Sequence, residues 1–188
     1  PGGLKLRDLN DDHAITEDDK TIIGDANPVH TGGFTLSGYY KGFDLSANFT
    51  WSYGNDIYNA DKIEFTSPTK YEFRNMITTM AEGKRWNNLN SDGTICNDPA
   101  KLTEMNASTT MWSPFMKKSV FHSWAVEDGS FLRLNTLTIG YSLPQNLLKK
   151  VYISNLRVYF TGYNLFCLTN YSGFDPEVDT RRNYRVTP

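Results

Sequence analysis

Apolar and polar residues alternate strictly along residues 43–53. Every odd position of this stretch, FDLSANFTWSY, is apolar or aromatic, and every even position is polar. Because successive side chains of a β-strand point to opposite faces, the pattern predicts a strand with one apolar and one polar face. At about 3.3 Å per residue and a tilt of about 40°, such a strand covers about 25 to 28 Å, the height of the apolar band of an outer-membrane barrel. The sequence therefore predicts a strand that crosses a membrane.

Three further stretches carry a similar alternation, namely residues 31–40, 131–143 and 155–166. Only Lys41 and Gly42 separate the first of them from residues 43–53. A two-residue link that contains glycine indicates a tight hairpin. Pro144 ends the second stretch, as is typical of a strand end. We therefore predict four strands in two hairpins.

The connections between these strands alternate between short and long. Short links lie at 41–42 and 145–154. A long link covers 54–128, and a further polar loop begins at 169. Short periplasmic turns and long extracellular loops at opposite ends are typical of outer-membrane barrels. The predicted fold class is all-β, part of a large antiparallel transmembrane β-barrel. Its predicted parts are an extracellular loop at 1–30, a transmembrane hairpin at 31–53, a long extracellular loop at 54–128, a second transmembrane hairpin at 129–168, and an extracellular loop at 169–188 leading to missing final strands.

The long loop contains a predicted short helix that begins at Ser67-Pro68. Its apolar residues recur at helical spacing up to Gly83, and they are Phe73, Met76, Ile77 and Met80. Proline just inside the start and glycine just past the end are typical of a helix. The rest of the loop is aromatic-rich, with Trp86, Trp112, Phe115, Phe121 and Trp124. These rings either pack within an extracellular cap or stack on sugar rings through their apolar faces, and both interpretations stay open.

Composition narrows the choice of function. Aromatic residues make up 14% of the chain, and the formal net charge is −2. An aromatic excess without long apolar runs favours β-structure, including barrels with aromatic girdles at the membrane interfaces. No run approaches the roughly 18 to 20 apolar residues of a membrane helix. The near-neutral charge would not attract nucleic acid, which we therefore do not expect as a partner.

Possible reactive groups are few. Cys96 and Cys167 form no CxxC motif, and the sequence leaves open whether they are free or bridged. No nucleophile elbow, P-loop, GxGxxG or HExxH motif occurs. His13, His30 and His122 are isolated from any nucleophile at a suitable spacing, so we expect loop residues rather than catalytic bases. The sequence predicts no enzymatic activity.

An acidic stretch near the start of the chain resembles an EF-hand loop. The candidate ligands stand at loop positions 1, 3, 5, 7, 9 and 12, and they are Asp8, Asn10, Asp12, the carbonyl of Ala14, Thr16 and Asp19. This order suits a hard cation, Ca²⁺ or Mg²⁺. His13 stands where the loop normally has glycine, and Asp19 replaces the longer glutamate, so we expect modest affinity at best. The alternative is a metal-free acidic turn held by side-chain to backbone hydrogen bonds.

Three stretches together resemble the SusC/RagA family of TonB-dependent outer-membrane transporters, in its C-terminal part. They are LRDLNDDHAITEDDKTIIG (6–24), VEDGSFLRLNTLTIGYSLP (126–144) and NLRVYFTGYNLFCLTNYSGFDPE (155–177). The resemblance implies a barrel of about 22 strands in the parent protein, filled by a plug domain that lies outside this chain. It also implies a location in the bacterial outer membrane.

The same resemblance implies the partners. A SusD-like surface lipoprotein would lid the barrel, and TonB would drive the uptake of nutrients through a region missing here. The nutrient would most often be an oligosaccharide and sometimes a peptide. Phe43, Leu45, Phe49 and Trp51 would face outer-membrane lipid. The alternatives are a passive or adhesive outer-membrane barrel, and a soluble carbohydrate-binding module in which two apolar faces meet in a core.

Overall fold

The computed structural model describes residues 2–68, 75–116 and 121–177. The chain divides into two compact units. The first combines Pro1–Ile23 with Asn59–Ala125, and the second combines Gly24–Tyr58 with Val126–Pro188.

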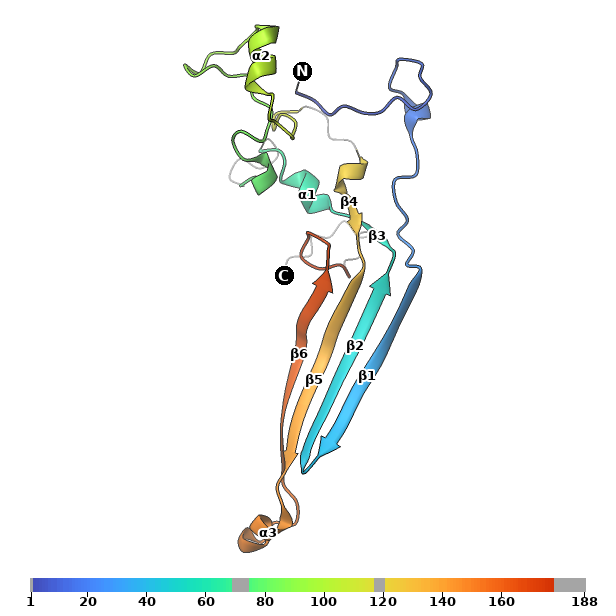
Figure 1. Cartoon of the computed structure of the whole chain (residues 1–188), viewed down its shortest axis with the longest axis vertical. Helices are drawn as coiled ribbons and strands as arrows, with labels where there is room; N and C mark the ends of the chain where they lie inside the picture. The colour runs from blue at the N-terminus through green and yellow to red at the C-terminus, as the bar shows by residue number, and fades with distance from the viewer. Residues whose placement is uncertain (1, 69–74, 117–120, 178–188) are drawn as a thin grey trace. The chain divides into compact units, whose positions relative to one another are not determined.

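The second unit is built on a four-stranded antiparallel sheet (Figure 1). Its strand order is β1-β2-β5-β6, with β1 at His30–Tyr40, β2 at Phe43–Tyr53, β5 at Phe131–Ser142 and β6 at Arg157–Thr169. A short second sheet pairs β3 (Asp56–Tyr58) with β4 (Val126–Asp128). The four long strands confirm the four strands predicted from the alternation. The largest change in bounds is at β6, which begins and ends later than the predicted 155–166.

The link between β1 and β2 is the predicted two-residue hairpin turn. Tyr40 pairs with Phe43, which leaves Lys41 and Gly42 as the turn residues. Both have positive φ, 47° and 92° respectively, as the right-handed twist of a tight hairpin requires. Lys41 tolerates this geometry at some cost, whereas Gly42 has no Cβ to clash with the carbonyl oxygen of Ser142.

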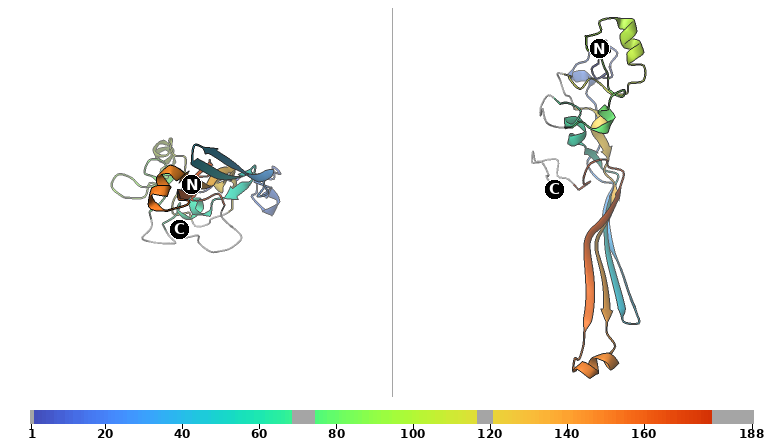
Figure 2. Two further views of the ribbon diagram at one scale, coloured as in Figure 1. Left: turned by 90° about the horizontal axis from the view of Figure 1, so that it is seen from below. Right: turned by 90° about the vertical axis from the view of Figure 1, so that its left-hand side faces the viewer.

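The link between β5 and β6 is longer and partly helical. It contains α3 at Gln145–Leu148, followed by a 3-10 turn at Lys149–Val151. Tyr152 ends that turn in the left-handed conformation, with φ of 59°. Figure 1 shows this link and the β1–β2 turn at the same end of the sheet, and the β3–β4 pair at the other end. Both links therefore lie at one end of the sheet, where Figure 2 shows them again from another side.

A β-bulge interrupts the sheet at the level of Asn135. The pairing of β2 with β5 shifts between Asn48 and Phe49, and the pairing of β5 with β6 shifts between Leu134 and Thr136. On β6 the irregularity coincides with Asn164, which has φ of 48°. An inserted residue changes which positions of a strand share a face. After the bulge, the odd positions of β5 (137, 139 and 141) therefore lie on the apolar face. Before the bulge, the even positions (132 and 134) lie on it.

The first unit consists of short elements. They are the 3-10 turns η1 (Glu17–Asp19), η2 (Thr78–Met80) and η3 (Ser123–Ala125), and the helices α1 (Ala60–Glu64) and α2 (Pro99–Met105). Asp98 caps α2 by accepting from the N–H of Ala100, and Pro99 stands in its first turn. Met80 is only 1% exposed and lies in the small core of this unit.

The predicted helix between Ser67 and Gly83 is wrong where the structure describes it. Residues 69–74 of that stretch lie outside the described residues. Ile77 is extended, with ψ of 155°, and only the 3-10 turn Thr78–Met80 follows it. The N–H of Ile77 donates to the carbonyl of Phe65 at 3.1 Å, so a non-local bond replaces the intrahelical one. Helical spacing of apolar residues did not reveal this competing partner.

Candidate functional site

The four long strands place most of their apolar side chains on one common face. At mid-height, the pairing brings together Leu36, Ala47, Leu137 and Gly162. On the other side of the bulge, the corresponding row is Phe34, Phe49, Leu134 and Phe166. The rings of Phe34 and Phe49 stack with centroids 4.7 Å apart. The register therefore extends the alternation seen in single strands to a continuous apolar surface.

Much of this apolar face is exposed in the second unit. Leu36 is 57% exposed, Phe160 68% and Leu168 60%. In a soluble sandwich such a face would be covered by a second sheet about 10 Å away. Large contiguous apolar patches mark surfaces that contact another protein or lipid. The face that contains Phe43, Leu45, Phe49 and Trp51 is therefore of the kind that contacts another protein or lipid.

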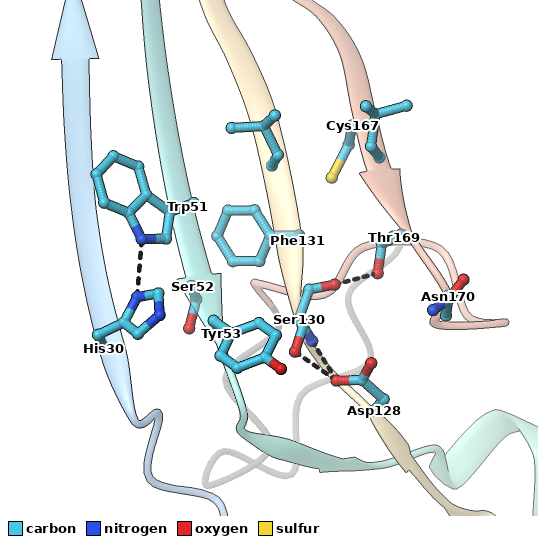
Figure 3. A pocket seen from close by; sticks show the side chains of 12 residues that line it. His30, Trp51, Ser52, Tyr53, Asp128, Ser130, Phe131, Cys167, Thr169 and Asn170 are labelled. Carbon is cyan, nitrogen blue, oxygen red and sulfur yellow. Dashed lines mark hydrogen bonds between the residues drawn. The ribbon is translucent and has the colours of Figure 1, made fainter.

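Aromatic residues gather at both ends of this face. At the end with the tight turn, the rings of Phe43 and Tyr141 lie 4.5 Å apart. At the other end, Trp51 Nε1 donates to His30 Nδ1 at 3.0 Å, and His30 stacks on Tyr53 with centroids 5.2 Å apart (Figure 3). The strand from position 43 to position 53 rises by about 33 Å, or about 25 Å at a 40° tilt. This spacing matches the two aromatic girdles of a membrane-spanning barrel.

The aromatic cluster of His30, Trp51 and Tyr53 borders a hollow of about 730 Å³, whose lining also contains polar side chains. Figure 3 shows that its lining residues come from all four long strands and from the segments that flank β5 and β6. Ser130 donates from both its N–H and its hydroxyl to Asp128 Oδ1. These two bonds hold the pKa of Asp128 below its usual range, the hydroxyl bond having the larger effect. The apolar face thus gives way to a charged rim at this end.

The opposite face of the sheet is polar and linked by side-chain hydrogen bonds. Asn48 donates to Thr35 Oγ1 at 2.9 Å, and Asn135 donates to Thr50 Oγ1 at 3.0 Å. The hydroxyls of Thr138 and Thr161 lie 3.0 Å apart. These bonds connect each strand to its neighbour, as is typical of cross-strand polar pairs.

An ion pair on the polar face spans three strands. Arg157 of β6 donates from Nε to Asp44 Oδ1 at 2.9 Å and from Nη2 to Oδ2 at 2.5 Å, although Asp44 belongs to β2. Gly140 of β5 lies between them, and a Cβ there would come within 2.5 Å of Asp44 Oδ1 and 2.6 Å of Arg157 Nη2. The absent side chain therefore makes room for a bidentate pair. The sequence alone does not predict this pair, because nothing local relates positions 44 and 157.

A second set of charges attaches the segment after β6 to the sheet. Arg133 is only 11% exposed in its side chain and donates from Nη2 to Asp175 Oδ1 at 2.6 Å. Its Nε lies 2.7 Å from Glu177 Oε2, as an ion pair without hydrogen-bond alignment. Ser172 donates from N and Oγ to the carboxylate of Glu127, which belongs to β4. These residues lie in two of the stretches that carried the family resemblance, but their pairing was not predicted.

The acidic loop at residues 8–19 is closed by its own hydrogen bonds. Asp8 accepts from the N–H groups of Asp11 and His13, both at 2.8 Å. Asp19 accepts from the N–H groups of Leu9 and Thr16, also at 2.8 Å, and the Thr16 bond is the larger cause of its lowered pKa. Asp11 and His13 have φ of 58° and 65°, so His13 adopts the left-handed turn that an EF-hand loop needs.

The fit of this loop to a cation is incomplete. Within residues 2–68, 75–116 and 121–177, no three His, Cys, Asp or Glu side chains are grouped so that they could hold one metal ion. Asn10 and Asp12 bond to each other, with Asn10 Nδ2 donating to Asp12 Oδ2 at 2.9 Å. The loop therefore has the backbone turn of a cation site, while its carboxylates point to backbone N–H groups. Cation binding by Asp8, Asn10, Asp12, Ala14, Thr16 and Asp19 stays a prediction.

The structure answers the question that the sequence left open about the two cysteines. Cys96 and Cys167 are both free thiols, so the disulfide alternative is wrong. Among the helices of the described residues, none is long and apolar enough to cross a membrane.

Comparisons with known proteins agree with the geometry of the sheet. No family model matches the chain. TonB-dependent receptor P3 of Formosa agariphila is 31% identical over 183 residues, which cover 97% of this chain. SusC of Bacteroides thetaiotaomicron, also a TonB-dependent receptor, is 28% identical over 173 residues, which cover 91% of this chain. The chain belongs to the TonB-dependent receptors.

Solved structures place this receptor segment in the same group. The RagAB peptide importer in its open-open state superposes with a TM-score of 0.63 and 27% identity, over 87% of this chain. The RagAB peptide transporter gives a TM-score of 0.59, also at 27% identity, over 80% of this chain. The chain spans only 16% of receptor P3 and 15% of SusC. Receptors of the SusC and RagA type are outer-membrane proteins, and the relatives are receptors and transporters rather than enzymes.

Proposed function

We propose that this segment forms part of the wall of a transmembrane β-barrel in an outer-membrane importer. The gathering of apolar side chains on one face over four paired strands carries the proposal. In this arrangement Phe43, Leu45, Phe49 and Trp51 face lipid, and the polar face lines the barrel interior. The parent barrel then has about 22 strands and a plug, as large outer-membrane transporters do.

Spin labels on neighbouring residues of β2 test the orientation of the wall. The parent receptor, with both native cysteines of this segment changed to serine, would carry either Leu45→Cys or Ser46→Cys. After reconstitution into lipid vesicles, a label at position 45 should collide with oxygen, which concentrates in the bilayer. A label at position 46 should collide instead with a water-soluble nickel chelate. Nickel access at position 45 equal to that at 46 would contradict the proposed orientation.

For the whole receptor, we propose TonB-driven uptake of an oligosaccharide together with a SusD-like surface lipoprotein. The family membership and the likeness to SusC support this proposal. Uptake by the parent strain should stop when either the receptor gene or the TonB gene is deleted. Uptake that continues without TonB would instead indicate a passive barrel, and loss of surface attachment without loss of uptake would indicate an adhesin.

Peptide uptake is the second candidate. It is favoured by the likeness to RagAB, which is described as a peptide importer. The two candidates differ in which nutrient the deletion strain fails to use when each is supplied as the sole carbon source. Growth defects on peptides but not on any oligosaccharide would favour the RagAB-like function.

Calcium at the acidic loop remains a separate proposal. The left-handed turn at His13 and the acidic side chains support it. Calorimetric titration of the parent receptor with Ca²⁺ should give heat that disappears in Asp8→Asn. Absence of heat at millimolar Ca²⁺ would leave the loop as a metal-free turn held by its own bonds.

A further inference from the structure

The first unit contains a hollow of about 550 Å³ that the wall function does not use. Its floor is formed where two segments meet side by side. Trp86 N–H donates to the carbonyl of Met111 at 2.9 Å, and Thr110 N–H donates to the carbonyl of Lys84 at 2.9 Å. The N-terminal segment closes one side, because Ser113 N–H donates to the carbonyl of Gly2 at 2.7 Å. The hollow is therefore built by backbone hydrogen bonds between three parts of one unit.

Aromatic rings form much of its lining. The rings of Trp112 and Trp124 meet edge to face at 5.0 Å, and Trp112 meets His122 at 5.4 Å in the same way. Lys62 Nζ lies 4.3 Å from the centre of the Trp124 ring and donates to the carbonyl of the same residue. Each of these three rings is half-buried, so each is fixed by its neighbours yet still borders the hollow.

The charge of the lining has one sign. Lys5 and Arg7 line the hollow, and its lining contains no Asp or Glu among the described residues. Both basic side chains belong to exposed residues, and within the described part of the chain neither takes part in an ion pair. A cavity with positive charge and no compensating carboxylate favours an anionic ligand. Thr109, Thr110 and Ser123 add hydroxyl-bearing side chains to the same lining.

We propose that this hollow, lined by Lys5, Arg7, Trp86, Trp112, His122 and Trp124, binds an anionic oligosaccharide. The proposal rests on the proposed import of oligosaccharides and specifies their chemical class. Flat, fixed tryptophan rings present apolar faces of the size of a sugar ring, and hydroxyl side chains can exchange hydrogen bonds with sugar hydroxyls. The basic residues then select sugars that carry a carboxylate or a sulfate. An extended peptide would instead be held mainly by main-chain bonds along a strand edge.

Calorimetry on the purified parent receptor tests this directly. The probes are an oligogalacturonate, its fully methyl-esterified neutral form, a sulfated oligosaccharide of equal length, and a glutamate-rich peptide of equal charge. At low salt, we expect one of the two anionic sugars to bind at least about tenfold more tightly than the neutral sugar. In Lys5→Gln/Arg7→Gln this preference should fall by up to about fivefold for each charge removed, the upper end of the range seen for exposed charge pairs. Lys101→Gln, an exposed charge of α2 outside the hollow, serves as the matched control.

The outcomes separate the two proposals. Equal binding of the neutral and both anionic sugars, or a double variant that binds like the control, would overturn the anionic-sugar site. Tighter binding of the peptide than of either sugar, lost in the double variant, would overturn the ligand class. The growth test of the deletion strain is independent of these results, so oligosaccharide import can stand when the hollow proposal fails. Heat-modifiable electrophoretic mobility confirms that each variant is folded.

Discussion

Placing a single arginine on the proposed lipid face tests the orientation of the sheet energetically. Leu36 is suited to this change because it is 57% exposed and pairs with Ala47, near the middle of β2. Leu36→Arg therefore removes little packing within the sheet. Its neighbour Ser37 points to the polar face and pairs with Ser46. Ser37→Arg is thus a matched control on the same strand.

The expected magnitudes differ clearly. An arginine facing lipid at the middle of a barrel costs about 2 to 4 kcal/mol, whereas an exposed surface substitution usually changes stability by less than about 0.5 kcal/mol. A difference of about 3 kcal/mol corresponds to about a hundredfold change in the folding equilibrium. We expect Leu36→Arg to lower the free energy of unfolding of the parent receptor in vesicles by this amount, and Ser37→Arg to lower it by less than about 1 kcal/mol.

Urea titration followed by heat-modifiable electrophoretic mobility measures both variants under one set of conditions. Similar losses in the two variants would show that position 36 does not face lipid. A larger loss for Ser37→Arg would reverse the orientation of the sheet and refute the reasoning from alternation.

Three further outcomes follow from the polar groups. Gly140→Ala should weaken the Asp44–Arg157 pair and lower the free energy of unfolding of the parent receptor. Gly38→Ala, with open space around its Cβ, should change that free energy little. Equal effects of the two changes would show that Gly140 does not make room for the pair. Arg133→Met should speed proteolytic cleavage within residues 170–177, because Asp175 and Glu177 lose their partner. Arg157→Met should leave that cleavage unchanged. Unchanged cleavage in both variants would show that Arg133 does not hold this segment on the sheet. The pKa of Asp19 is lowered in the fold, so its stabilising effect is full above the ordinary value of 3.8 and is lost as the pH falls through the lower folded value. At pH values below about 4, hydrogen exchange should therefore show less protection of the Leu9 and Thr16 amides. At neutral pH, Asp19→Asn should lack that protection, whereas Asp18→Asn should keep it.

The strands were predictable because their signal is local. A strand with one apolar face repeats every second residue, and this repeat is visible without knowing its partners. The one clear error in bounds lies at β6, where the predicted strand ended at 166 and the observed strand ends at Thr169. The alternation of β6 keeps its phase through the bulge, because Gly162, Phe166 and Leu168 all pair with residues of the apolar face. The late end of β6 instead reflects non-local pairing, since Cys167, Leu168 and Thr169 pair with Arg133, Leu132 and Phe131 of β5.

The site could be predicted only in part. The apolar face followed from alternation, but the ion pair of Asp44 with Arg157 depends on the register of three strands and on a glycine between them. Residues 113 positions apart carry no joint pattern that a reading of one sequence detects. The predicted helix before Gly83 failed for a related reason, since the extended backbone at Ile77 is fixed by a bond to Phe65. Non-local partners decided each of these features.

The proposed wall function requires further strands beside the two edges of the sheet. Within the described residues, β1 and β6 each pair on one side only, although they are 11 and 13 residues long. In water such long edges would invite aggregation, and in lipid each unpaired backbone group costs several kcal/mol. In the proposed barrel, neighbouring strands of the parent receptor would satisfy both edges. Residues 1–188 expressed alone should therefore fail to insert into vesicles and should aggregate, whereas the parent receptor inserts; stable insertion of the isolated segment would contradict its role as one part of a closed wall.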